Sequence, residues 1–143
     1  MTTFESEIKK ANCNEDEIYD LISDLNNIDR FKEMIPSDKI KDVTYDADSC
    51  QFTVDPVGKL GLRIVDREPS KTVKFAADQS PIDFNLWIQM KQVAENDTRI
   101  KVTVKAELNP FIKPMVEKPL NMFVEKIADG LSKIPFKDLK KNC

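Results

Sequence analysis

The sequence predicts an α+β fold in which a curved, seven-stranded antiparallel sheet wraps around a long C-terminal α-helix, with two short helices between the first and second strands. Between residues 38 and 108, short segments that are apolar on one side alternate with turn residues, which is typical of an antiparallel meander with one face in water. After residue 110 the apolar spacing changes to three and four, as in an amphipathic helix. Without internal repeats or linkers, we expect a single domain over residues 1–143.

The first strand is predicted from strict alternation near the N-terminus. Phe4, Ser6 and Ile8 share one side of an extended chain, and charged residues occupy the positions between them. A period of two is typical of a strand with one side buried. We therefore expect these three side chains to face the core.

Two short helices are expected next. Asn14 lies three residues before Glu17, an arrangement that resembles a capping box and indicates a helix N-terminus. Apolar residues at helical spacing between 18 and 25 form the buried side of this helix. A second group, residues 28–34, has the same spacing and ends before Pro36, because the residue before a proline disfavours helical backbone.

Six strands account for residues 38–108. Turn segments separate them at 55–58, 68–70, 79–81 and 94–97. The facing of the strand after residue 38 stays open, since Ile40 indicates one parity and Val43 with Tyr45 the other. In the other five strands the residues expected to face the core are Cys50, Phe52, Val54, Leu60, Leu62, Ile64, Val73, Phe75, Ala77, Ile82, Phe84, Leu86, Ile88, Met90, Ile100, Val102, Val104, Ala106 and Leu108.

A single long helix is expected after Asn109 and Pro110. Its apolar residues recur every three or four positions as far as Ile134, which predicts about 24 residues and a length of about 36 Å. A long strand of the sheet spans about 40 Å, so the helix can lie across the whole sheet. Pro119 lies inside the helix, removes one backbone donor and is expected to bend it.

Composition and charge exclude several classes of protein. A net charge of −3 argues against a nucleic-acid binder. The chain shows no secretory signal and no apolar run of about 20 residues, and its three widely spaced cysteines suit free thiols, so we expect a cytoplasmic protein. Residues 111–143 hold seven lysines against four acidic residues, which indicates either a solvated helix face or transient contact with anionic lipid headgroups.

The residue types leave little room for catalysis. The chain has no histidine and no pair of cysteines at metal-binding spacing, so no catalytic residue, metal or cofactor is predicted. Asp66 is the one candidate polar cavity group, because it continues the inward series that ends at Ile64; the alternative is that it marks the end of the strand. Trp87 has the opposite parity to Phe84 and Leu86, so we expect it to face outward as a candidate protein contact.

The sequence resembles the START-like, helix-grip superfamily, also called SRPBCC, which includes polyketide cyclases, coenzyme-Q-binding proteins and proteins of the birch-pollen-allergen type. The resemblance covers residues 2–136. Within this superfamily, the sequence is most similar to small bacterial members of unassigned function. It rests on the opening Phe4-Glu5-Ser6-Glu7, the helix pair from Glu15 to Met34, the Asn109-Pro110-Phe111 exit from the last strand, and the closing Ile134-Pro135-Phe136. One feature departs from the pollen-allergen branch, since the segment from Asp55 to Gly61 contains only two glycines and not a glycine-rich loop.

The resemblance implies a small hydrophobic ligand held in a cavity between the sheet and the long helix. On periodicity alone, the same side chains would fill a solid core. The residues expected to line the cavity are Phe52, Leu62, Ile64, Phe75, Phe84, Leu86, Ile88, Val102, Val104, Met115, Phe123 and Ile127, with Asp66 as the polar group.

Three functional hypotheses follow. The leading one is non-catalytic binding or carriage of a lipid-like or polyketide-like molecule, because the apolar faces are one-sided and histidine is absent. The alternative is a cyclase-like or dehydratase-like enzyme that relies on cavity shape and on an acid such as Asp66. The third is an interaction or regulatory module with a solid core and a contact at Trp87, since related folds also regulate chaperone ATPases and ribosomes.

Overall fold

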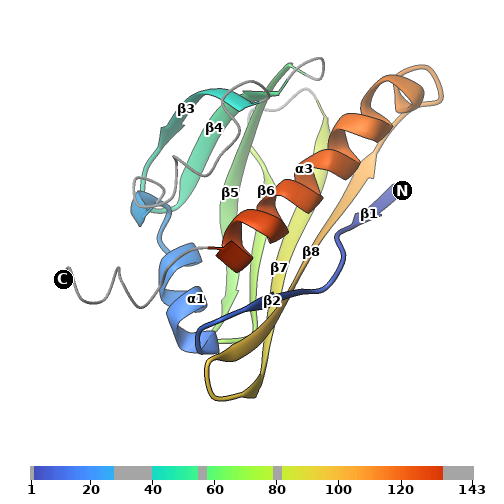
Figure 1. The fold of residues 1–143 in the computed structure, drawn as a ribbon. Helices are drawn as coiled ribbons and strands as arrows, with labels where there is room; N and C mark the ends of the chain where they lie inside the picture. The colour runs from blue at the N-terminus through green and yellow to red at the C-terminus, as the bar shows by residue number, and fades with distance from the viewer. Residues whose placement is uncertain (1, 28–39, 55–57, 79–81, 134–143) are drawn as a thin grey trace.

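The computed structural model describes residues 2–27, 40–54, 58–78 and 82–133 (Figure 1). The expected helix at 28–34, the turn residues 55–57 and 79–81, and the closing residues 134–136 lie outside these ranges. The elements follow in the order β1 (Thr2–Glu5), β2 (Lys9–Ala11), α1 (Glu15–Ile22), the 3-10 helix η1 (Leu25–Asn27), β3 (Ile40–Tyr45), β4 (Ser49–Val54), β5 (Gly58–Glu68), β6 (Thr72–Ala77), β7 (Asp83–Ala94), β8 (Asp97–Glu107) and α3 (Lys113–Lys133).

The eight strands form one antiparallel sheet that curves around α3, so the predicted fold class is confirmed (Figure 1). The strand order is β1-β8-β7-β6-β5-β4-β3, and β2 pairs with β8 beside β1. Helix α3 packs mainly against β8, β1 and β2. Its 21 residues span about 32 Å. No helix among the described residues has the length and apolar character needed to cross a membrane.

Alternation places nearly all of the expected strand residues in the core. On β7 the side chains from Phe84 to Met90 at every second position are buried, and on β8 those from Ile100 to Ala106 are buried in the same way. These faces meet the buried side of α3, which is formed by Val116, Leu120, Phe123, Val124, Ala128 and Leu131. The core therefore lies between the concave face of the sheet and the long helix.

The N-terminal strand differs from the prediction because it is broken into β1 and β2. Glu5 pairs with Thr103, whereas Lys9 pairs with Ile100, so the register on β8 shifts by one residue between the two strands. A shift of one residue moves side chains to the opposite face. Phe4 is buried as expected, but Ile8 is 65% exposed, which corrects the expectation that it faces the core.

The Ser6 side chain completes the ladder where the two strands break. Its backbone N–H donates to the carbonyl of Val102 at 2.8 Å, and its Oγ accepts the N–H of Val102 at 2.9 Å while donating to the carbonyl of Glu7. The hydroxyl thus takes the place of a strand carbonyl, and no buried backbone donor is left unpaired at this point.

A second register shift explains why the sequence pattern of β3 did not show which of its side chains face the core. Between Lys41 and Thr44 the pairing with β4 shifts by one residue, and Asp42 in this segment has a φ of 55°. The two parities seen in the sequence therefore each apply to a different part of the strand. The bulge also makes this edge strand irregular, which disfavours pairing with another chain.

Asn14 is the N-cap residue of helix α1, as predicted, but its side chain makes no capping hydrogen bond. Its Oδ1 accepts the N–H of Asn96 at 2.8 Å, which holds the β7–β8 turn. The N–H of Glu15 donates to Oε1 of Gln92, and the N–H of Gln92 donates to the Glu15 carboxylate, both at 3.0 Å. Gln92 of β7 thus accepts a backbone N–H at the helix N-terminus, whereas the sequence predicts a local capping box there.

Substituting Ser6→Ala should lower the free energy of unfolding by about 1–3 kcal/mol, because it leaves the buried N–H of Val102 without an acceptor. Urea unfolding followed by circular dichroism measures the change. Ser132→Ala serves as the control, since its hydroxyl donates to a carbonyl within α3 and is only half-buried. Equal losses in the two variants would contradict the role given to Ser6.

Candidate functional site

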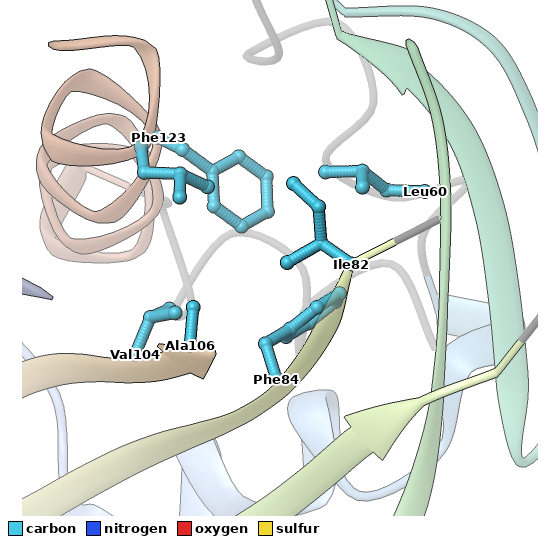
Figure 2. A pocket seen from close by; sticks show the side chains of 7 residues that line it. Leu60, Ile82, Phe84, Val104, Ala106 and Phe123 are labelled. Carbon is cyan, nitrogen blue, oxygen red and sulfur yellow. The ribbon is translucent and has the colours of Figure 1, made fainter. Parts of the chain in front are cut away.

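The candidate site is an apolar pocket between α3 and the end of the sheet formed by the start of β7 and the end of β8 (Figure 2). Strand alternation points its sheet residues toward the helix, and Phe84 pairs directly with Ala106 across the two strands. The seven lining residues are Leu60, Ile82, Phe84, Val104, Ala106, Leu120 and Phe123. All seven side chains are hydrocarbon, so the pocket offers no hydrogen bond from a side chain.

The pocket is almost completely filled by its own walls. Its volume is about 10 Å³, about the space of one water molecule, whereas pockets for small molecules usually measure about 300 Å³ or more. One of its lining side chains, Phe123 on α3, also stacks on Phe52 of β4, with ring centroids 5.4 Å apart and an interplanar angle of 22°. This contact joins the helix to β4, four strands away from β8 in the sheet.

Three of the predicted cavity residues, Phe84, Val104 and Phe123, line this pocket. Ile127 is half-buried and packs against the same core. The other predicted aliphatic and aromatic residues on the strands are buried in that core but do not line the pocket: Phe52, Leu62, Ile64, Phe75, Leu86, Ile88 and Val102.

Met115 is placed wrongly by the sequence prediction. Its side chain is 60% exposed, whereas Val116 beside it is buried against the sheet. Successive helical residues point about 100° apart, so the neighbour of a buried residue can face water. The apolar pattern of α3 included both residues, and only the packing of the helix decides which one faces inward.

Four lining residues were missed as cavity residues. Three of them, Leu60, Ile82 and Ala106, belong to the inward faces that the sequence predicts. They differ from the other inward residues in lying near the ends of those faces. Leu120 follows Pro119, and it is buried at helical spacing from Val116 and Phe123. The sequence thus carries the direction of these side chains but not the position of the gap between them.

Asp66 is exposed and does not enter the pocket, which corrects its assignment as a polar cavity group. The pairing of β5 with β6 shifts by one residue between Ile64 and Asp66, so the inward series stops at Ile64. Asp66 then pairs with Lys74, while Arg67 pairs with the buried Val73. An acid or base at Asp66 therefore cannot act on a molecule in this pocket.

The buried thiols are not nucleophiles at neutral pH. Burial raises the pKa of Cys13 to about 12, with smaller contributions from the carboxylates of Glu17 and Asp16. Burial likewise raises the pKa of Cys50 to about 12, helped by Asp46. A thiol with such a pKa is protonated and inert at pH 7. The described part of the chain also contains no cluster of three or more side chains that could hold a metal ion.

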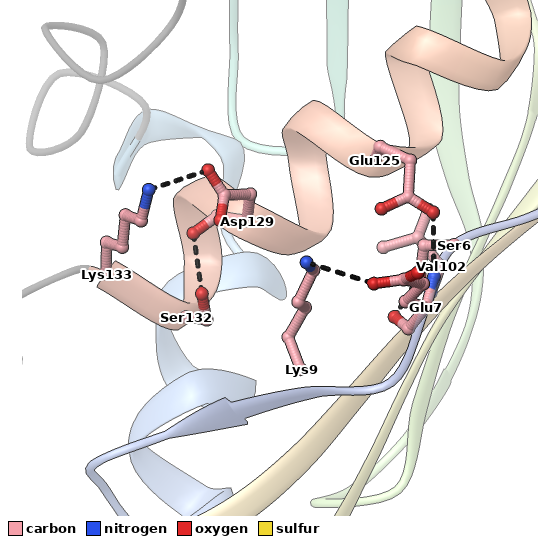
Figure 3. A network of polar contacts seen from close by, with 8 residues as sticks. All are labelled: Ser6, Glu7, Lys9, Val102, Glu125, Asp129, Ser132 and Lys133. Carbon is pink, nitrogen blue, oxygen red and sulfur yellow. Dashed lines mark hydrogen bonds and ion pairs between the residues drawn. The ribbon is translucent and has the colours of Figure 1, made fainter.

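A polar network ties the second half of α3 to the N-terminal strand (Figure 3). The N–H of Glu7 donates to Oε1 of Glu125 at 2.8 Å, and the Glu7 carboxylate lies 3.6 Å from Nζ of Lys9. One turn later, Nζ of Lys133 donates to Oδ2 of Asp129 at 2.9 Å, and this bond lowers the pKa of Asp129. The helix segment over the pocket, which lies nearer its N-terminus, has no such bond among the described residues.

Comparisons with known proteins support the fold. No protein-family model matches the sequence, and no curated protein matches it either. Among solved structures, norcoclaurine synthase from Thalictrum flavum in complex with dopamine and hydroxybenzaldehyde has a TM-score of 0.69 at 13% identity, over 95% of this chain and 87% of that one. A START superfamily protein from Mycobacterium smegmatis has a TM-score of 0.68 at 13% identity, over 99% of both chains.

A third similar structure is the Aha1 dimer from Colwellia psychrerythraea, with a TM-score of 0.60 at 15% identity over 94% of this chain and 99% of that one. At such identities the likeness concerns the fold alone. The long C-terminal helix, the curved antiparallel sheet and these structural neighbours agree with one another. The chain therefore has the START-like, helix-grip fold that its sequence resembles.

Proposed function

We propose that this protein binds a small apolar molecule between the sheet and α3 and does not transform it. The observation that carries the proposal is the composition of the pocket, whose seven lining side chains are all hydrocarbon. Such walls favour an apolar guest through burial of its surface, and they offer no group for acid, base or nucleophilic catalysis. The fold shared with norcoclaurine synthase, whose structure holds dopamine and hydroxybenzaldehyde, supports the binding of a small molecule.

Binding requires the pocket to widen, because it now holds only about 10 Å³. The segment best able to move carries Leu120 and Phe123, since Pro119 lacks the N–H that would otherwise bond the preceding turn of α3. The contact between Glu7 and Glu125 would hold the rest of the helix in place. A guest would then replace the ring of Phe123 against the sheet.

Filling the pocket should abolish binding, and Ala106→Met tests this. We expect the wild type to bind the apolar dye N-phenylnaphthylamine saturably, with a rise in dye emission, and Ala106→Met to bind it about tenfold more weakly or worse, because its added atoms occupy the site. The matched control is Ala128→Met, which enlarges an equally buried alanine of α3 outside the pocket lining. Circular dichroism confirms that both variants are folded.

Equal dye binding by the two variants would show that the pocket is not the binding site. Native mass spectrometry of protein from its own host, followed by organic extraction, then tests for a natural guest. A protein that carries no apolar adduct and binds no apolar probe would overturn the proposal.

We further propose that guests are exchanged at an anionic membrane surface. Phe111, Met115 and Met122 are 88%, 60% and 39% exposed. The spacing of Met115, Lys118, Met122 and Lys126 places these residues on one side of α3, away from its buried face. The side chain of Asn109 accepts the N–H groups of Phe111 and Ile112 at 2.9 and 3.0 Å, which orders the turn that presents Phe111. Exposed apolar groups among lysines suit a lipid surface.

Anionic vesicles should therefore sediment the wild type, and Lys118→Glu with Lys126→Glu should weaken this binding by roughly 30-fold or more, at about 1 kcal/mol per lysine. Phe111→Ser with Met115→Ser should weaken it as well. The control is Val65→Ser with Val93→Ser, which removes two exposed apolar side chains that lie outside α3. Equal losses in the control, or equal binding to uncharged vesicles, would refute the membrane contact.

A second candidate function is that of an interaction module with a solid core. The small volume of the pocket favours it, because a filled core needs no guest for stability. The fold shared with the Aha1 dimer is compatible with it. Under either function we propose a cytoplasmic protein of one domain, since the free thiols of Cys13 and Cys50 suit a reducing compartment.

A further inference from the structure

The face of the sheet turned away from α3 has an aromatic side chain near its centre. Trp87 lies on β7 between the buried residues Leu86 and Ile88, so it faces outward, as its parity predicts. It is half-buried, and it pairs with Lys74 on β6 and with Thr103 on β8. This surface is on the opposite side of the sheet from the pocket and is independent of the function proposed above.

Two lysines cover the Trp87 ring. Nζ of Lys74 lies 5.3 Å from the ring centroid, and Nζ of Lys105 lies 5.7 Å from it, both within the range of a cation–π contact. Within the described ranges neither ammonium group has a carboxylate within 4.0 Å, although Asp66 is the register partner of Lys74. Among the described residues, the two ammonium groups thus lie near the same ring without a direct ion pair to a carboxylate.

The positive charge is concentrated around the tryptophan. The strand register places eight residues of β6, β7 and β8 next to Trp87 on the outward face. Three of these eight are lysines, and none is acidic. The third lysine, Lys101, forms an exposed ion pair with Glu5 at 3.4 Å. The other neighbours are Thr72, Ala76, Asn85, Gln89 and Thr103. With Glu5 counted, the local charge is +2 on a chain whose net charge is −3.

We propose that Trp87, Lys74, Lys101 and Lys105, here called the Trp87 cluster, bind an acidic segment of a partner protein. Carboxylates of the segment would pair with Lys74 and Lys105, and an apolar side chain between them would pack on the indole ring. Neighbouring strands lie about 4.8 Å apart, so a cluster on three strands is about 10 Å wide, which suits a few residues of peptide. A nucleic acid would need a longer basic track and would meet repulsion from the acidic remainder of the chain.

The single tryptophan of the chain makes the site directly observable. A short peptide of alternating glutamate and leucine, labelled with a dye that does not absorb the indole emission, serves as the probe. We expect saturable binding by anisotropy, together with a shift of Trp87 emission at the same peptide concentrations. Raising the salt concentration should weaken both signals, because the contacts are between exposed charges.

Lys74→Glu with Lys105→Glu should weaken peptide binding about tenfold or more, since it reverses both uncompensated charges. The matched control is Lys118→Glu with Lys126→Glu, which changes the net charge equally but lies on α3. Trp87→Ala should also weaken binding in a variant that stays folded by circular dichroism. Ala106→Met should leave peptide binding unchanged, which separates this site from the pocket.

Three outcomes would overturn the proposal. The first is no peptide binding at low salt, and the second is an equal loss in the two charge-reversal variants, which would indicate attraction to the whole chain. The third is tighter binding of single-stranded DNA of similar length through Lys74 and Lys105, which would assign the cluster to nucleic acid.

Discussion

Burial of one apolar face of the sheet against α3 is the constraint on which the rest of the structure depends. Each long strand presents every second side chain to the concave side, and a sheet that is apolar on one face needs a cover. The single long helix supplies that cover, and the sheet curves around it (Figure 1). The stack of Phe52 on Phe123 extends the contact from the helix to β4.

The same constraint separates the chemistry of the two faces. Side chains that face α3 are hydrocarbon wherever they line the pocket, so that face can recognise shape and apolar surface only. The charged groups lie on the outward face, where Lys74 and Lys105 lie over the Trp87 ring. The two proposed binding sites therefore lie on opposite sides of one sheet.

Register shifts explain where alternation alone misleads. Ile8 and Asp66 each follow a shift of one residue, and both side chains lie on the opposite face from the one that simple parity assigns. The two parities in β3 have the same cause, at the shift near Asp42. Each shift depends on how a strand pairs with its partner, which is adjacent along the chain for β3 and β5 and distant for Ser6 and Val102, so the alternation within one strand cannot locate it.

The sequence by itself determined the fold class, the order of the elements and the facing of most strand residues, because burial of one face imposes a period of two on strands and of about 3.6 on the helix. Only the tertiary structure decided which of those buried residues enclose a pocket and how little space it holds. Packing depends on distances of a few ångströms between segments such as Leu60, Ile82 and Leu120, which periodicity does not encode. For the same reason the exposure of Met115, and the pairing of two lysines with Trp87, emerged only when the helix and the strands were in place.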